Sequence, residues 1–221
     1  MAKVFLSPSN QYDNVYAYGN TTEGVQCGKI ADACKIALER SGVDVMLMHD
    51  ESMQEKCAAS NAFDADLHVP IHTNAFNGKV MGTRMFCYNA EGKGMEACKA
   101  IFARLAPITP GESENIQVNA DYYEVRVPAA PTAYIECEFH DTVEGAKWIV
   151  ENTVLIGETI ARGICDYFGV TFKEPEQPKP AAPASGKLYR VQVGAFSVRE
   201  NAEKMLARLK AAGFDGYIRE W

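Results

Sequence analysis

The sequence has no run of about 20 apolar residues, the length that a membrane-spanning helix needs. Its first residues lead directly into a strand-like segment, without the apolar core and cleavage site of a signal peptide. We therefore expect synthesis in the cytoplasm and no membrane partner.

Cysteine pairs of the C-x-x-C type are also missing. The seven cysteines are odd in number and scattered along the chain, a pattern typical of reduced thiols rather than of a disulfide framework. A zinc site built from cysteine pairs is therefore disfavoured.

The chain lacks an excess of basic residues. Its net charge of -7 argues against a nucleic-acid partner, because phosphate neutralisation needs a basic surface. The charge is uneven: residues 1–173 carry 14 Lys and Arg against 23 Asp and Glu, or -9, whereas residues 187–221 carry 7 against 4, or +3. This asymmetry predicts two parts with different partners.

Between these parts, residues 174–186 contain four prolines and no apolar periodicity, which is typical of an extended linker. We predict a large domain at residues 1–173, this linker, and a small segment at residues 187–221.

Short apolar runs alternate with helical patterns in the large domain. Strands are expected at residues 3–6, 44–48, 67–71, 83–88 and 133–139, and helices at 23–41, 53–62, 94–106 and 143–168. This alternation predicts an α/β fold with a mostly parallel central sheet flanked by helices and a ligand site at the carboxyl ends of the strands. After the linker, a strand at 188–193, a helix at 201–212 and a strand starting at 217 predict a small β-α-β piece, too short to bury a core alone.

The last strand of the large domain places acids in an otherwise apolar run. By period-2 alternation, Glu136, Glu138 and His140 should share one face. Burial of unpaired carboxylates costs several kcal/mol, so such a strand usually has a metal, a partner or a reaction. His68 and His72 lie on one face of an earlier strand, and together these residues predict the walls of a metal site.

A further acid, Glu23, opens the first helix after a polar loop. Divalent cations accept histidine nitrogen and carboxylate oxygen, and a catalytic zinc needs three protein ligands and an open position. We interpret His49 and His68 as structural, hydrogen-bonded residues, because most single histidines on strands have that role.

Seven short motifs follow one another along residues 4–170: Ser7-Pro8-Ser9-Asn10-Gln11, Thr22-Glu23, Ser60-Asn61 before Ala65-Asp66-Leu67, Ile71-His72-Thr73-Asn74-Ala75, Gly82-Thr83, Tyr123-Glu124-Val125-Arg126, and Ile135-Glu136 before Phe139-His140-Asp141. In this order and spacing they resemble the zinc-dependent N-acetylmuramoyl-L-alanine amidases of bacterial autolysins and phage endolysins. The resemblance implies Zn²⁺ as cofactor and hydrolysis of the amide bond between N-acetylmuramic acid and L-alanine in peptidoglycan.

Family members hold zinc with a histidine after the first strand, a glutamate opening the first helix, and the histidine of the Ile-His-x-Asn-Ala motif. The last two correspond to Glu23 and His72. The first histidine is absent, because Ser9 and Asn10 stand where the family has Gly-His. The third ligand is therefore open between four side chains: His140, which we favour, and Asn10, Gln11 and Glu138.

The family's catalytic glutamate corresponds to Glu136, which the resemblance makes the general base toward water and the general acid toward the leaving nitrogen. Arg126 lies where the family often has an arginine, and would orient a stem-peptide carboxylate or bind the oxyanion. Two alternatives stay open: a peptidoglycan-binding protein whose amidase site has lost its metal, and a zinc carboxypeptidase that acts on stem peptides.

Residues 189–196 and Asn201-Ala202 resemble the opening half of a SPOR module, a peptidoglycan-binding β-α-β-β-α-β unit with a ferredoxin-like arrangement. Either two chains pair their halves into a homodimer or the sequence ends before the second half. The amidase resemblance and the missing signal peptide together predict that the protein reaches the wall after cell lysis or through a holin.

Overall fold

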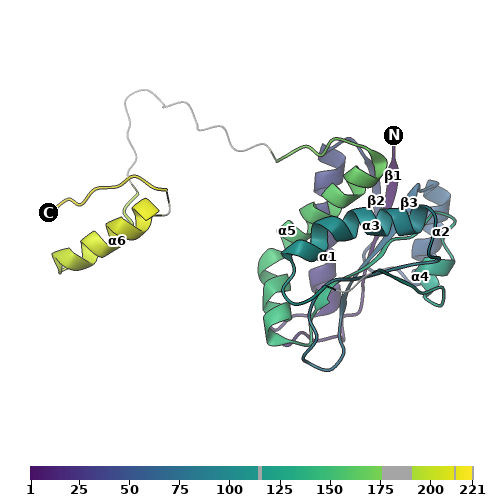
Figure 1. Cartoon of the computed structure of the whole chain (residues 1–221), viewed down its shortest axis with the longest axis horizontal. Helices are drawn as coiled ribbons and strands as arrows, with labels where there is room; N and C mark the ends of the chain where they lie inside the picture. Colours follow the sequence, from purple (N-terminus) through teal and green to yellow (C-terminus); the bar gives the residue numbers. More distant parts are fainter. Residues whose placement is uncertain (114–115, 176–190, 212, 221) are drawn as a thin grey trace. The chain divides into compact units, whose positions relative to one another are not determined.

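A six-stranded sheet forms the centre of residues 1–175 in the computed structural model (Figure 1). Its order is β2-β1-β3-β6-β4-β5, and the strands are β1 (Lys3–Pro8), β2 (Asp44–Leu47), β3 (Leu67–Asn74), β4 (Arg84–Cys87), β5 (Ile116–Val118) and β6 (Tyr134–Phe139). The first four strands of that order are parallel, whereas β4 runs antiparallel to β6 and pairs in parallel with β5. The predicted α/β fold with a mostly parallel sheet is confirmed.

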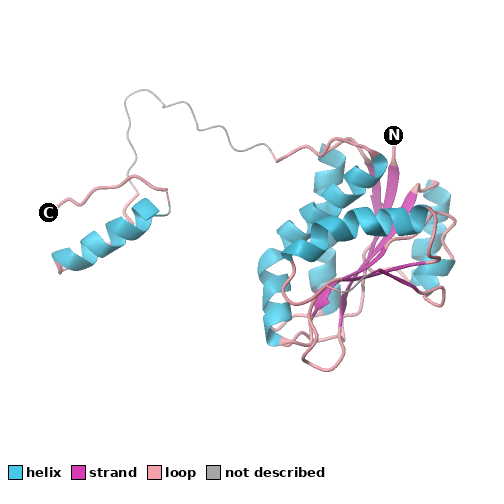
Figure 2. Cartoon of the chain, viewed as in Figure 1, coloured by secondary structure: helices cyan, strands magenta, loops and turns pink. Residues whose placement is uncertain are grey.

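Helices cover both faces of the sheet (Figure 2). One face carries α1 (Glu23–Arg40), α3 (Lys93–Leu105) and α5 (Val143–Phe168), and the other carries α2 (Met53–Phe63) and the single turn α4 (Tyr123–Arg126). A 3₁₀ turn, Ala106–Ile108, follows α3. Helices α1 and α3 each pack against α5, and the apolar core lies on the side of these three helices.

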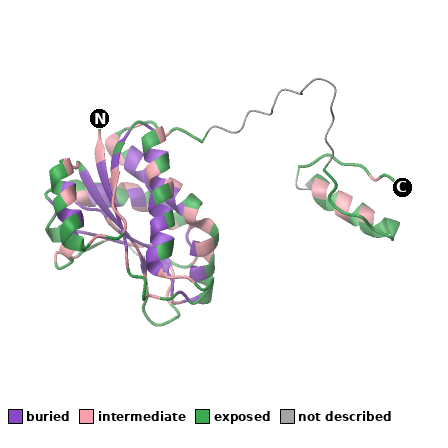
Figure 3. Ribbon diagram, turned by 180° about the vertical axis from the view of Figure 1, so that it is seen from behind, coloured by how far each residue is buried: buried purple, intermediate pink, exposed green. Residues whose placement is uncertain are grey.

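Close packing of α1 on α5 anchors this core. A side chain at Gly157 would collide with the backbone of Ile30, so only glycine lets the two helices approach this closely. The strands and the inward sides of α1 and α5 are the most buried parts of the unit (Figure 3). This packing fixes the start of α1, and with it Glu23, relative to the carboxyl ends of the strands.

The structure describes residues 1–113, 116–175, 191–211 and 213–220. The chain divides into two compact units, Met1–Pro175 and Glu176–Trp221. In the second unit the predicted helix is present as α6 (Arg199–Ala211). Among the residues described, no helix is long and apolar enough to cross a membrane.

The strands predicted on either side of α6 are absent from the described part of the second unit. Residues 191–193 and 217–218 are not in strands, and residues 188–190 lie outside the described residues. Val191 is 91% exposed and Tyr217 71%. A strand needs a neighbour to satisfy its backbone groups, and this unit offers no described strand to pair with.

Three details of the large unit differ from the sequence prediction. Strand β3 continues to Asn74, so His72 lies inside a strand rather than after it. Strand β5 and helix α4 have three and four residues, too few for a periodic pattern to show. The antiparallel direction of β4 was also not predicted, because pairing direction leaves no mark in a four-residue strand.

Candidate active site

Glu23 and His72 form the centre of the site at the carboxyl edge of the sheet. Glu23 is the first residue of α1, and its Oε1 lies 2.9 Å from Nδ1 of His72 in β3. Burial is the largest single influence and favours a neutral Glu23, but the hydrogen bond and charge of His72, together with hydrogen bonds from Asn14 and Ser9, lower the pKa of the carboxyl group overall. Burial also opposes a charged His72, and the bond and charges of its acidic neighbours raise its pKa nevertheless. A carboxylate and an imidazole, two typical zinc ligands, therefore converge as the sequence predicted.

The loop after β1 brings two amide side chains to this pair. Nε2 of Gln11 lies 3.5 Å from Oε1 of Glu23 and 3.5 Å from Nδ1 of His72. Asn14 donates to the other carboxylate oxygen of Glu23 at 2.8 Å and to Oε1 of Gln11 at 3.0 Å. Backbone bonds from Glu23 to Asn14 and from Gly24 to Gln11 hold the loop against the start of α1. Of these two amides, Gln11 lies within 3.5 Å of both Glu23 and His72.

Glu136 lies beside His72, because the two residues are register partners of β6 and β3. It is 9% exposed, and its Oε2 is buried without a hydrogen-bond partner among the described residues. Burial raises its pKa to about 7, with Glu23 adding to the rise and the positive charges of His72 and Arg84 opposing it. A carboxyl group with this pKa exchanges protons at neutral pH, as a general base must.

Arg84 is an arginine that the sequence analysis missed. It is the register partner of Glu136 across the antiparallel pair of β4 and β6, and its guanidinium lies 5.0 Å from the ring of Phe139. Arg84 lies opposite Glu136 in the antiparallel pair of β4 and β6. The sequence of a four-residue strand does not indicate this direction.

The expectation that His140 shares the face of Glu136 is wrong. A bulge separates them: β3 advances from His72 to Asn74 while β6 advances from Glu136 to Phe139. The extra residue in β6 resets the alternation of faces. Nδ1 of His140 lies 3.0 Å from the hydroxyl and 3.1 Å from the carbonyl oxygen of Thr73, the neighbour of His72 on the opposite strand face.

Tyr16 completes the surroundings of His140, since the two rings stack at 4.9 Å. Burial lowers the pKa of His140, so its imidazole is neutral at neutral pH. Through Thr73, the ring of His140 ties β3 to the end of β6 behind the Glu23–His72 pair.

Comparisons with known proteins show which family the chain belongs to. The family model described as N-acetylmuramoyl-L-alanine amidase matches residues 11–166, a segment that includes Gln11, Glu23, His72 and Glu136. The chain belongs to this amidase family. The SPOR domain model matches residues 177–220.

Two curated relatives match almost the whole amidase chain. The sporulation-specific N-acetylmuramoyl-L-alanine amidase of Bacillus subtilis is 25% identical over 99% of this chain and 84% of that protein. The N-acetylmuramoyl-L-alanine amidase CwlM of Bacillus licheniformis is 24% identical over 99% of this chain and 85% of that protein.

Solved amidase structures share the fold. The catalytic domain of CwlV from Bacillus (Paenibacillus) polymyxa has a TM-score of 0.70 at 16% identity, over 77% of this chain and 100% of that one. AmiC2 of Nostoc punctiforme has a TM-score of 0.67 at 19% identity, over 76% of this chain and 97% of that one.

Glu138 holds the loop between β3 and β4 of the amidase unit. Its fully buried carboxylate accepts hydrogen bonds from the amides of Gly82 and Phe139, both at 2.7 Å. Asp141 accepts two more, from the amides of Phe76 and Gly78, each at 2.8 Å. The acids that follow Glu136 therefore fix the loop beside the site, and Phe76 is 72% exposed on it.

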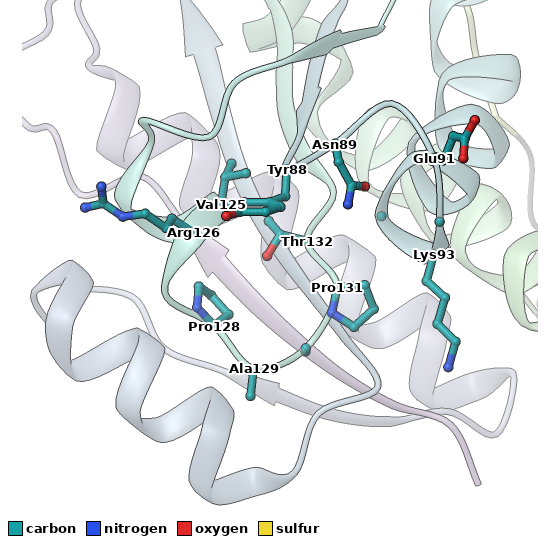
Figure 4. A pocket seen from close by; sticks show the side chains of 13 residues that line it. Tyr88, Asn89, Glu91, Lys93, Val125, Arg126, Pro128, Ala129, Pro131 and Thr132 are labelled. Carbon is teal, nitrogen blue, oxygen red and sulfur yellow. The ribbon is translucent and has the colours of Figure 1, made fainter.

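Asn10 and Arg126 point elsewhere. Nδ2 of Asn10 donates to the carbonyl oxygens of Asp50 and Glu51, at 3.3 and 3.0 Å. Arg126 is exposed at the end of α4 and lines a cavity of about 330 Å³ between α4 and the start of α3. Figure 4 shows its guanidinium pointing away from Thr132 in the cavity wall.

A second buried polar cluster lies between α2, β3 and α4. His68 bonds through Nδ1 to Ser60, at 3.0 Å, and through Nε2 to Glu124, at 3.2 Å, and Ser7 donates to the same carboxylate oxygen. The expected structural role of His68 fits these bonds. The ligand atoms of Cys57, His68 and Glu124 lie within 4.8 Å of one another, so they form a second group with metal-binding atoms.

Proposed function

We propose that the chain hydrolyses the amide bond between N-acetylmuramic acid and L-alanine with zinc held by Glu23, His72 and Gln11, and with Glu136 as the general base. Membership of the amidase family supports the reaction. The observation that carries the residue roles is the convergence of Glu23 and His72 at 2.9 Å beside a buried carboxyl group with a pKa of about 7.

The residues present fit a zinc ion. Glu23 and His72 supply one oxygen and one nitrogen, and the amide of Gln11 lies 3.5 Å from both ligand atoms. A half-turn of the terminal amide group exchanges its oxygen and its nitrogen, so Gln11 can turn its oxygen toward the ion. Zinc bound there would polarise the scissile carbonyl and lower the pKa of water.

Glu136 transfers the proton of the attacking water to the leaving nitrogen. At neutral pH a large share of this group is ionised, so its carboxylate accepts a proton from the attacking water. The same group then returns the proton to the leaving alanine nitrogen, which departs as an amine when the carbon–nitrogen bond breaks. No second acid is required, because one proton is taken and one is given back.

One experiment separates this function from its alternatives. Purified protein is incubated with purified peptidoglycan, and the new amino termini and any free amino acids are identified by mass spectrometry. An amidase releases stem peptides that begin with L-alanine. Release of a C-terminal amino acid would indicate a carboxypeptidase, and no release, together with an absence of bound zinc, would indicate a peptidoglycan-binding protein.

Gln11 is tested as the third ligand by three substitutions. Gln11→Ala should weaken zinc binding at least tenfold, because it removes a ligand atom, whereas Gln11→His should strengthen it by supplying an imidazole. The matched control is Asn10→Ala, whose side chain bonds to Asp50 and Glu51 instead of facing the pair. Zinc affinity is measured by competition with a chromogenic chelator. Equal affinity of Gln11→Ala and the wild type would exclude Gln11, and His140→Ala would be tested next.

The second unit is proposed to bind peptidoglycan and to pair with a copy of itself. The SPOR match supports the first part, and the exposed apolar side chains Val191, Phe196, Phe214 and Tyr217 support the second. Removing residues 176–221 should lower binding to sedimented cell walls and turn any dimer into a monomer in analytical ultracentrifugation. A full-length protein that is monomeric at all concentrations would contradict the pairing, while wall binding would still test the SPOR assignment.

A further inference from the structure

Tyr134 packs face to face on His72. The two ring centres lie 4.7 Å apart with 18° between the planes. The other surroundings of the Tyr134 ring are Tyr122, at 5.1 Å, and Phe86, at 6.1 Å. A ring held by three aromatic neighbours has a fixed direction.

The Tyr134 hydroxyl lies on the same strand face as Glu136, because the two residues are two positions apart in β6, before the bulge. Among the described residues it has no hydrogen-bond partner. Phenols have an ordinary pKa of about 10, so the group is protonated at neutral pH. The site therefore contains a half-buried hydroxyl donor without an acceptor.

The amide side chains near the pair are already engaged. Asn14 donates to Glu23, Asn10 donates to backbone oxygens, and Gln11 is assigned to zinc. Amide hydrolysis needs a donor, since negative charge develops on the carbonyl oxygen when water adds to the carbon.

We propose that Tyr134 is a catalytic residue whose hydroxyl donates a hydrogen bond to the oxygen of the scissile carbonyl. The inference rests on the proposed amidase function and assigns a further residue to it. Tyr134 keeps its proton throughout: Glu136 takes the proton of water and gives it to the leaving nitrogen, so the hydroxyl stabilises charge without exchanging atoms. The stacked ring has a second effect, because it holds His72 in the orientation that faces Glu23.

The test compares Tyr134→Phe with Tyr134→Leu. Tyr134→Phe keeps the stacked ring and removes only the hydroxyl, so kcat on soluble muramoyl peptides should fall about 100-fold, as after loss of one oxyanion donor. Its KM, zinc content and thermal unfolding temperature should match those of the wild type. Tyr134→Leu also removes the stack, and should lower both kcat and zinc affinity. The matched control is Tyr88→Phe, which removes a phenol hydroxyl from the cavity beside α4 and should leave kcat unchanged.

Two outcomes would overturn the inference alone. Tyr134→Phe with a kcat within threefold of an active wild type would reduce Tyr134 to a packing residue. A loss of activity matched by an equal loss of zinc would show that Tyr134 acts only through His72. A wild-type protein that binds zinc but releases no L-alanine amino termini would instead overturn the proposed function and this inference together.

Discussion

Glu136→Gln should reduce the release of L-alanine amino termini at least 1,000-fold while zinc stays bound. The amide has nearly the same shape as the carboxylate but cannot accept a proton from water at neutral pH. The substitution leaves Glu23 and His72 unchanged, so the metal content measured by mass spectrometry should equal that of the wild type. Loss of zinc from Glu136→Gln would show that Glu136 is a ligand and that another acid is the base.

The pH profile and a matched variant complete this test. Because burial raises the pKa of Glu136 to about 7, kcat/KM should fall as the pH drops through that value and the base becomes protonated. Glu138→Gln is the control, since Glu138 is a buried acid of the same strand whose oxygen accepts backbone amides, which a glutamine oxygen also does. Glu138→Gln should show the same fall in kcat/KM below pH 7 as the wild type. A profile that does not change below pH 7 would exclude Glu136 as the base.

His72→Ala should remove both zinc and activity. The substitution deletes a proposed ligand and leaves Glu23 buried without its partner, so zinc affinity should fall at least 1,000-fold and cleavage should be undetectable. Equilibrium dialysis against buffered zinc, followed by the peptidoglycan assay, measures both losses on one preparation.

His49→Ala is the control for His72→Ala, because the His49 ring is 40% exposed and bonds only to Asp32 among the described residues. It should keep zinc and activity. If His72→Ala keeps stoichiometric zinc, the ion lies on other residues. The group of Cys57, His68 and Glu124 would then be tested with Cys57→Ser.

Much of the fold could be predicted because its long elements repeat a simple pattern. Helix α5 was expected at residues 143–168 and begins and ends at those residues, since its apolar stripe is long and Gly169 ends it in a left-handed conformation. Strand β5 and helix α4 could not be predicted, because three or four residues hold no full period. The strands expected beside α6 are absent from residues 191–193 and 217–218, because local pattern alone does not supply the neighbour that a strand pairs with.

The sequence predicts the parts of the site that depend on the position of a single residue. It does not predict the parts that depend on the register between paired strands. Glu23 and His72 were expected together and lie together, because a helix start and a strand end meet at one edge of a parallel sheet. The expectation for His140 assumed unbroken alternation, and a bulge in β6 breaks it. Gln11 was only one of four candidates, because the path of the loop after β1 depends on backbone bonds to the start of α1.

Glu138 and Asp141 hold the loop between β3 and β4 by hydrogen bonds. Substitutions in this loop and substitutions in the strand of Glu136 should therefore have different effects on this enzyme. Glu138 and Asp141 bond to the backbone amides of Phe76, Gly78 and Gly82, so these contacts do not depend on the exposed side chain of Phe76. A substitution at Phe76 can therefore change the surface beside the site while Glu136 and its strand stay in place.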